Sequence, residues 1–134
     1  DNGARLLDLP QFVDERGGLT FGEQFDHAPF NIKRVYYIYD VPPDETRGEH
    51  AHEDLEQVLV AANGQFDVRI DDGRSAVTIT LDTPDKGLFV PGMTWRVMEN
   101  FADETVCLVF ASEYYDEDDY VHDYEEFLAE RTQE

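Results

Sequence analysis

The sequence has little cysteine, little basic charge and no long apolar run. Its one cysteine, Cys107, has no partner for an internal disulfide and lies in the apolar segment 105–110, which indicates a buried core thiol. No stretch of about 18 apolar residues is present, and no charged-then-apolar leader opens the chain. Neither a membrane span nor secretion is therefore indicated, and we expect a cytoplasmic protein.

Basic residues are scarce beside the acidic ones. Ten lysines and arginines oppose 31 aspartates and glutamates, which gives a net charge of −21, and only Lys33 and Lys86 are lysines. This charge would repel the phosphates of nucleic acids and anionic membranes, so we expect neither as a partner. The excess resembles the acidic surfaces of halophile proteins, in which salt screens self-repulsion. We interpret the chain as halophile-like, with an ordinary acidic protein as the alternative.

The composition is sufficient for one core. With 134 residues, of which 41% are hydrophobic, we expect a single domain over residues 1–134. Short β-type segments recur between turns, at residues 5–9, 19–25, 31–39, 46–60, 65–70, 76–81, 88–92, 94–98 and 105–111. This spacing predicts an all-β sandwich or barrel, and Asn63-Gly64 predicts a hairpin turn. Apolar residues at helical spacing predict one short C-terminal helix at about 119–131.

The stretch 46–60 organises the chain because it contains His50 and His52. Side chains alternate along a strand, so both imidazoles lie on one face. If the strand continues without a bulge, that face also carries Glu56, Val58 and Val60, and the other carries Leu55, Gln57 and Leu59. Apolar residues on both faces predict a strand buried between two layers. Such a histidine pair is either reactive or a satisfied part of the core.

The motifs resemble a known family. The pattern His-x-His-x3-Glu, followed by Gly-x3-Pro-Gly-x2-Trp, resembles the two motifs of the cupin superfamily. Segments 33–38, 47–52, 55–60 and 111–120 together resemble the nucleotide-sugar 3,4-ketoisomerases, and the resemblance covers residues 6 to 128. It implies a cupin jelly roll, or double-stranded β-helix sandwich, and usually a homodimer with exchanged N-terminal strands. It also implies an isomerase of deoxyaminosugar biosynthesis that acts on TDP-4-keto-6-deoxyglucose, a TDP-linked 4-keto-6-deoxyhexose.

The same motifs bear on metal binding. Metal-binding cupins resemble this chain at His50, His52 and Glu56 but supply a further histidine where this sequence has Arg96. A guanidinium stays protonated and has no lone pair to offer a metal. We therefore expect no metal and no cofactor, although the three remaining side chains could form a facial triad. Otherwise Glu56 orients an imidazole by a hydrogen bond or is a buried structural acid.

Histidine chemistry suits the implied reaction. Moving a ketone from C4 to C3 requires one proton to leave C3, another to reach C4, and a third to pass between the oxygens. Groups with a pKa near the working pH do this best, and histidine is such a group. We expect His50 and His52 to divide the carbon and oxygen proton transfers, in an order that the residues leave open.

Further candidates follow from the substrate. A diphosphate needs local positive charge, and arginine offers bidentate donors, so we expect Arg34 and Arg47 to bind it unless nearby carboxylates pair with them. Tyr36 and Tyr37 point to opposite faces of one strand, and we predict that Tyr37 lines the site.

The sequence leaves more than one role open for residues of the second motif and of one loop. Trp95 either contacts the base or sugar or belongs to the core. Arg96, together with Arg16 in a Gly-flanked loop, is expected to bind substrate and to bear on the C4 configuration of the product. His27 and His122 lie outside the motifs and are expected at the surface, and segment 114–120 is expected to be a packing turn that anchors the helix.

Three other functions fit parts of the pattern. A cupin 3,5-epimerase of the same substrate would also begin by deprotonating C3. A non-catalytic sugar-binding cupin would have no need of two titrating histidines. A metal-dependent oxygenase is disfavoured by Arg96.

Overall fold

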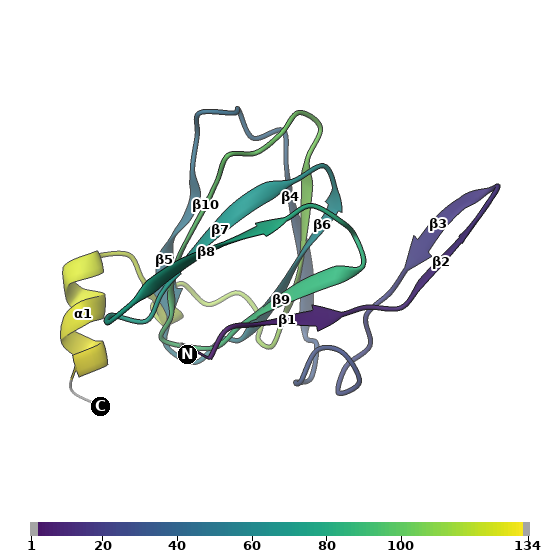
Figure 1. Cartoon of the computed structure of the whole chain (residues 1–134). Coiled ribbons are helices and arrows are strands. Elements are labelled where there is room, and N and C mark those ends of the chain that lie inside the picture. The colour runs from purple at the N-terminus through teal and green to yellow at the C-terminus, as the bar shows by residue number, and fades with distance from the viewer. Residues whose placement is uncertain (1–2, 133–134) are drawn as a thin grey trace.

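Two five-stranded antiparallel sheets face each other in a computed structural model that describes residues 3–132 (Figure 1). The first sheet consists, in spatial order, of β1 (Arg5–Asp8), β9 (Lys86–Val90), β6 (Gln57–Asn63), β11 (Val106–Ala111) and β4 (Arg34–Tyr39). The second consists of β12 (Tyr120–Val121), β5 (Arg47–His52), β10 (Trp95–Glu99), β7 (Phe66–Asp71) and β8 (Ala76–Leu81). The predicted all-β jelly-roll class is confirmed.

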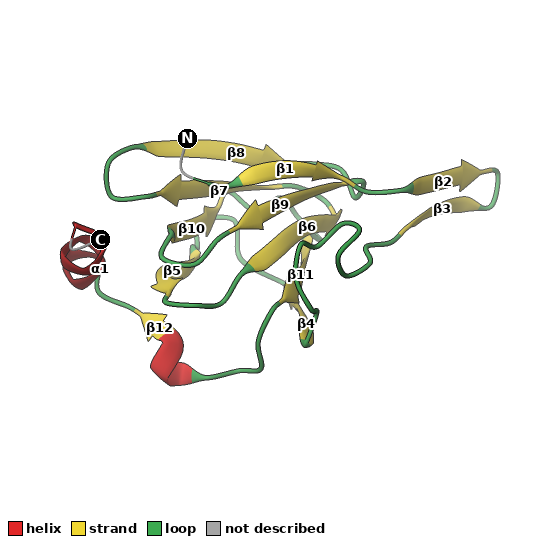
Figure 2. Ribbon diagram, turned by 90° about the horizontal axis from the view of Figure 1, so that it is seen from below, coloured by secondary structure: helices red, strands yellow, loops and turns green. Residues whose placement is uncertain are grey.

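A separate hairpin extends from the sandwich. It is formed by β2 (Gln11–Asp14) and β3 (Gly17–Thr20), and both views show it projecting away from the two sheets (Figures 1 and 2). The strand predicted at 5–9 is present as residues 5–8, whereas the one predicted at 19–25 is replaced by the hairpin strands at 11–14 and 17–20. Residues 5–8 pair with β9, and Pro10, which cannot donate to a ladder, separates them from the hairpin.

The core lies between the sheets. Phe66, Val68 and Ile70 of β7 are fully buried, as their alternation predicts. They pack with inward-facing residues of the first sheet, including Leu59 and Cys107. Burial raises the pKa of the Cys107 thiol to about 12, and its position confirms the predicted core thiol.

The chain crosses from one sheet to the other at two places where the sequence predicted a continuous strand or a hairpin. β5 ends at His52 in the second sheet and β6 begins at Gln57 in the first, so residues 46–60 are not one strand. The predicted hairpin at Asn63-Gly64 was also wrong, because β6 and β7 belong to different sheets. Gly64 has a φ of 74°, and a Cβ there would lie 2.8 Å from the Thr105 Cα atom. Glycine is therefore required at this position, because the turn that carries the chain from one sheet to the other passes close to Thr105.

The C-terminal segment contains more than the predicted helix. A 3₁₀ helix, η1 (Glu117–Asp119), leads into β12, and the helix α1 (Tyr124–Thr132) begins five residues later than predicted. Pairing of Tyr120 with His52 and of Val121 with Ala51 extends this segment as a strand and overrides its helical pattern. α1 lies at the opposite end of the sandwich from the hairpin (Figure 1). No helix within residues 3–132 is long and apolar enough to cross a membrane.

Candidate active site

His50 and His52 point into the interior of the sandwich from β5. Between them Ala51 points outward and packs in the cluster beneath α1, as strand alternation requires. The two imidazoles meet edge to face, with ring centroids 4.7 Å apart and an interplanar angle of 89°. His52 is buried at 1% exposure, whereas His50 is partly accessible and lines a cavity. His50 is thus the more accessible of the two histidines.

That cavity has a volume of about 400 Å³ and lies between the two sheets at one end. Its walls come from β4, β5, β10, β12 and the segment before β12, and are formed by Arg34, Tyr36, Ile38, Arg47, Gly48, His50, Met98, Tyr115 and Tyr120. The ring of Tyr120 packs against both histidines, with centroids 4.9 Å from His50 and 4.3 Å from His52. The cavity therefore combines cationic, aromatic and imidazole groups.

Asp119 positions His52. Its Oδ2 atom lies 3.1 Å from His52 Nδ1, while its Oδ1 atom accepts a hydrogen bond from the Asp54 N–H at 2.9 Å. A carboxylate accepts only, so a neutral His52 carries its proton on Nδ1 and leaves Nε2 as a free acceptor. Nε2 is buried and has no hydrogen-bond partner among the described residues.

Both histidines are held neutral. Burial, followed by the positive charge of Arg96, lowers the pKa of His50 to about 3 and that of His52 to about 2. Each imidazole is accordingly unprotonated at neutral pH and has a lone pair that can accept a proton, although a pKa this far below the working pH makes it a weak base in the unliganded chain.

Arg96 lies behind the cavity and does not line it. It faces His50 across the β10–β5 pair and is 1% exposed. Its Nη2 donates to the Thr94 carbonyl at 3.1 Å and its Nη1 donates to Gln57 Oε1, while Nε has no partner among the described residues. It forms no ion pair with any described carboxylate. Burial lowers its pKa to about 10, so the guanidinium remains charged.

Gln57, not Glu56, shares the interior with the histidines. The amide of Gln57 is 2% exposed and joins Arg96 to the Tyr36 hydroxyl, to which its Nε2 donates at 2.6 Å. The expectation that Glu56 lies on the histidine face was wrong, because the chain changes sheets between His52 and Gln57. The Glu56 backbone instead exchanges two hydrogen bonds with Ser112. The polar Glu53-Asp54 pair was the one signal of this break.

Two aromatic candidates lie elsewhere. Tyr37 is 61% exposed on the outer face of β4, beside Tyr39, and Tyr36 is the tyrosine of this pair that lines the cavity. Trp95 points outward from β10 and packs beneath α1, with ring centroids 5.3 Å from Tyr124 and 5.8 Å from Phe127. Of its two predicted roles, the core role holds.

The predicted arginines separate into two groups. Arg34 and Arg47 both line the cavity. The Arg34 guanidinium lies 5.1 Å from the Tyr36 ring centroid and 5.8 Å from that of Tyr115, and its Nε and Nη2 atoms are buried without a hydrogen-bond partner among the described residues. Arg16 lies instead in the turn of the projecting hairpin, where it pairs with Asp14 at 2.8 Å. Within one chain it is remote from the histidines.

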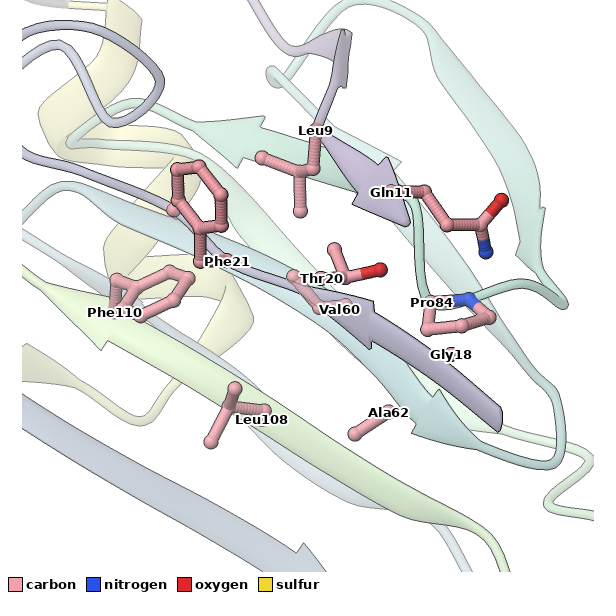
Figure 3. A pocket seen from close by; sticks show the side chains of 11 residues that line it. Leu9, Gln11, Gly18, Thr20, Phe21, Val60, Ala62, Pro84, Leu108 and Phe110 are labelled. Carbon is pink, nitrogen blue, oxygen red and sulfur yellow. The ribbon is translucent and has the colours of Figure 1, made fainter. Parts of the chain in front are cut away.

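A second cavity, of about 380 Å³, lies beneath the root of the hairpin (Figure 3). Leu9 and Phe21 line it from the N-terminal segment, and Val60, Leu108 and Phe110 line it from the outer face of the first sheet. No titratable side chain lines it, so it lacks the groups needed for acid–base chemistry.

Comparison with known proteins assigns the family. Residues 2–132 match the model of the family described as "FdtA: WxcM-like, C-terminal". The chain belongs to the WxcM-like, C-terminal (FdtA) family. It is 46% identical over 123 residues, 92% of this chain and 88% of the other, to a TDP-4-oxo-6-deoxy-alpha-D-glucose-3,4-oxoisomerase from Aneurinibacillus thermoaerophilus.

Two solved structures agree with this family. The 3,4-ketoisomerase from Helicobacter canadensis is 42% identical with a TM-score of 0.93, over 97% of this chain and 98% of the other. A histidine-to-asparagine variant of the 3,4-ketoisomerase QdtA from Thermoanaerobacterium thermosaccharolyticum is 39% identical with a TM-score of 0.94, over 97% and 94% of the two chains. That structure contains TDP-4-keto-6-deoxyglucose.

Sequence reasoning missed three groups in this FdtA-family chain. Asp119 and Tyr120 were assigned to a packing turn, although they contact the histidines directly. His122 is exposed as expected, yet its ring stacks on Tyr120 at 5.2 Å and lies 6.1 Å from that of His50. The many acidic residues in this segment favoured its interpretation as a surface turn, so nothing in the sequence indicated that it contacts the histidines. No set of three His, Cys, Asp or Glu side chains in residues 3–132 is arranged to hold a metal.

Proposed function

We propose that this chain is a TDP-4-keto-6-deoxyglucose 3,4-ketoisomerase that acts by histidine-mediated proton transfer through an enediol. The observation that carries the proposal is a pair of neutral imidazoles in edge contact, one of which lines a cavity with two arginines. The 46% identical relative named as a 3,4-oxoisomerase supports the same reaction.

The two histidines have different surroundings, which suggests different roles. His50 lines the cavity, so we assign it both the removal of the C3 proton and the delivery of a proton to C4, with exchange against solvent at the imidazole between the two steps. His52 donates Nδ1–H to Asp119 and retains a free Nε2 lone pair, so we assign it the hydroxyl proton that passes between the two oxygens. The carbonyl and hydroxyl exchange places without net oxidation of the sugar.

Arg34 and Arg47 are the proposed diphosphate contacts. Unpartnered guanidinium nitrogens of Arg34 are available for phosphate oxygens, and two aromatic rings restrict its orientation. The reaction as proposed uses no metal and no cofactor, since Arg96 occupies the second-motif position of a ligating histidine and has no lone pair.

The assembly is proposed to be a homodimer with exchanged N-terminal strands. Phe12, Val13 and Leu19 of the hairpin are 64%, 68% and 58% exposed, which is costly for a lone chain. A second copy could cover them and would receive Arg16, where it could bear with Arg96 on the C4 configuration. We further propose a cytoplasmic location, and a salt-adapted surface on the basis of the −21 charge.

Proton NMR of TDP-4-keto-6-deoxyglucose in heavy water at high salt tests the reaction. We expect a 3-keto sugar with deuterium at C4, and the coupling between H4 and H5 gives its configuration. Exchange at C3 and C5 without ketone migration would indicate a 3,5-epimerase, and no change would favour a sugar-binding cupin. His50→Asn and His52→Asn should each abolish turnover in a folded protein, and wild-type rates in both would refute the assignment.

A further inference from the structure

The hydrogen-bonded series Arg96–Gln57–Tyr36 connects a buried cation to the wall of the cavity. Nη1 of Arg96 donates to Gln57 Oε1, and Gln57 Nε2 donates to the Tyr36 hydroxyl oxygen. Arg96 and Gln57 are both buried, at 1% and 2% exposure, and Tyr36 lines the cavity beside His50. We propose that this series makes the Tyr36 hydroxyl a hydrogen-bond donor to the enediolate oxygen. The inference rests on the proposed isomerase reaction.

The donor direction follows from the inventory of hydrogen-bonding atoms. Arginine has no acceptor, so the side of the Gln57 amide that faces Arg96 must be its oxygen. Its nitrogen therefore faces Tyr36, where it can only donate. Since the Tyr36 oxygen accepts this bond, its own proton is directed away from Gln57 and is available to a molecule in the cavity.

Tyr36 keeps that proton. Burial raises the pKa of its hydroxyl above the ordinary value of 10.0, with the nearby charge of Arg96 acting in the opposite direction. A neutral phenol donates a hydrogen bond, whereas a phenolate would only accept one.

The buried positive charge of Arg96 also stabilises the negative charge that forms on the substrate. A buried guanidinium that is bonded only to neutral oxygens retains much of its desolvation cost. When His50 removes the proton from C3, the electron pair of the C–H bond moves toward the carbonyl and places negative charge on the C4 oxygen. That charge is stabilised by the Tyr36 donor and by the field of Arg96, both fixed before the reaction begins.

Tyr36→Phe tests the donor. Removing one preorganised donor to a developing oxyanion costs about 10²- to 10³-fold in kcat, and KM should change little because the bond strengthens only with the charge. Tyr39→Phe is the matched control, because Tyr39 lies on the same strand but is 60% exposed on the outer face. It should leave kcat unchanged.

Gln57→Glu tests the direction. A carboxylate at this position accepts the Tyr36 proton and gives Arg96 a counter-charge, so the donor is withdrawn from the cavity while the shape is kept. We expect a kcat loss comparable to that of Tyr36→Phe, without a fall in melting temperature. In the double variant the loss should match that of Tyr36→Phe within about twofold, whereas independent losses would multiply to about 10⁴-fold or more.

The outcomes separate this inference from the proposed function. A wild-type protein that does not migrate the ketone refutes the isomerase, and the inference with it. An active wild type whose Tyr36→Phe variant retains its kcat, or whose double variant shows multiplied losses, refutes the inference alone. Deuterium exchange at C3 should fall in parallel with kcat in Tyr36→Phe, because the enediolate forms in that step.

Discussion

Asp119→Asn should invert the tautomer of His52. In the wild type the Asp119 Oδ1 atom accepts from the Asp54 N–H, and Oδ2 accepts from His52 Nδ1. An asparagine that keeps the first bond must turn its NH₂ group toward Nδ1, and it then loses the longer 3.4 Å bond that Oδ2 accepts from the Leu55 N–H. His52 must then accept at Nδ1 and carry its proton on Nε2, so that the free lone pair is lost.

The expected loss in kcat is calculated from the hydrogen bond between Asp119 and His52, whose direction the substitution reverses. A hydrogen bond to an ionised acceptor contributes about 1.5–3 kcal/mol, which corresponds to a loss of about 10- to 150-fold in kcat. Steady-state kinetics with the NMR assay above measures it, and ¹⁵N chemical shifts of the ring nitrogens report the tautomer without turnover. Asp118→Asn is the control, because Asp118 is an exposed neighbour that has no side-chain contact with His52. Unchanged kcat and an unchanged Nδ1–H tautomer in Asp119→Asn would refute the positioning role.

Three further predictions concern stability. Because the folded-state pKa values of His50 and His52 lie near 3 and 2, below the ordinary 6.5, the unfolded chain binds more protons in acid; stability is full above pH 6.5 and is lost as the pH falls toward 3. Urea titrations from pH 8 to pH 4 should show the free energy of unfolding falling with pH, and falling less steeply in His50→Asn than in the wild type. Equal pH dependence in the two proteins would contradict the prediction. Raising KCl from about 0.1 M to about 1 M shortens the screening length from about 10 Å to about 3 Å and should raise the melting temperature; a flat curve would argue against salt adaptation. Trp95→Leu should lower the free energy of unfolding by about 1–3 kcal/mol through lost packing on Tyr124 and Phe127 with KM unchanged, so a rise in KM at full stability would return Trp95 to the site.

Local patterns predicted much of the fold. Period-two alternation identified β4, β7, β8 and β11 close to their observed bounds, and the alternating apolar residues of β7 are all buried. Failures occurred where the chain changes sheets. The segments after His52 and after Asn63 contain residues that fit a continuous strand or a hairpin equally well, and only pairing with distant strands decides between them.

The site was predicted in part for the same reason. His50, His52, Arg34 and Arg47 could be predicted because their motif places them on short local segments. Gln57 was assigned to the wrong face by the break after His52. Asp119 and Tyr120 were missed because their contacts with the histidines span nearly 70 residues, a separation of 67 for Asp119 and His52. No periodicity in a sequence reports contacts of that range.

That long separation also orders events during biosynthesis. A nascent chain carries His50 and His52 well before it carries Asp119 and Tyr120, so until then β5 has an unpaired edge and His52 has no anchor. Domains begin to fold as they are synthesised, yet contacts between distant residues must wait for both partners. Catalytic competence should therefore be among the last properties that this chain acquires at the ribosome.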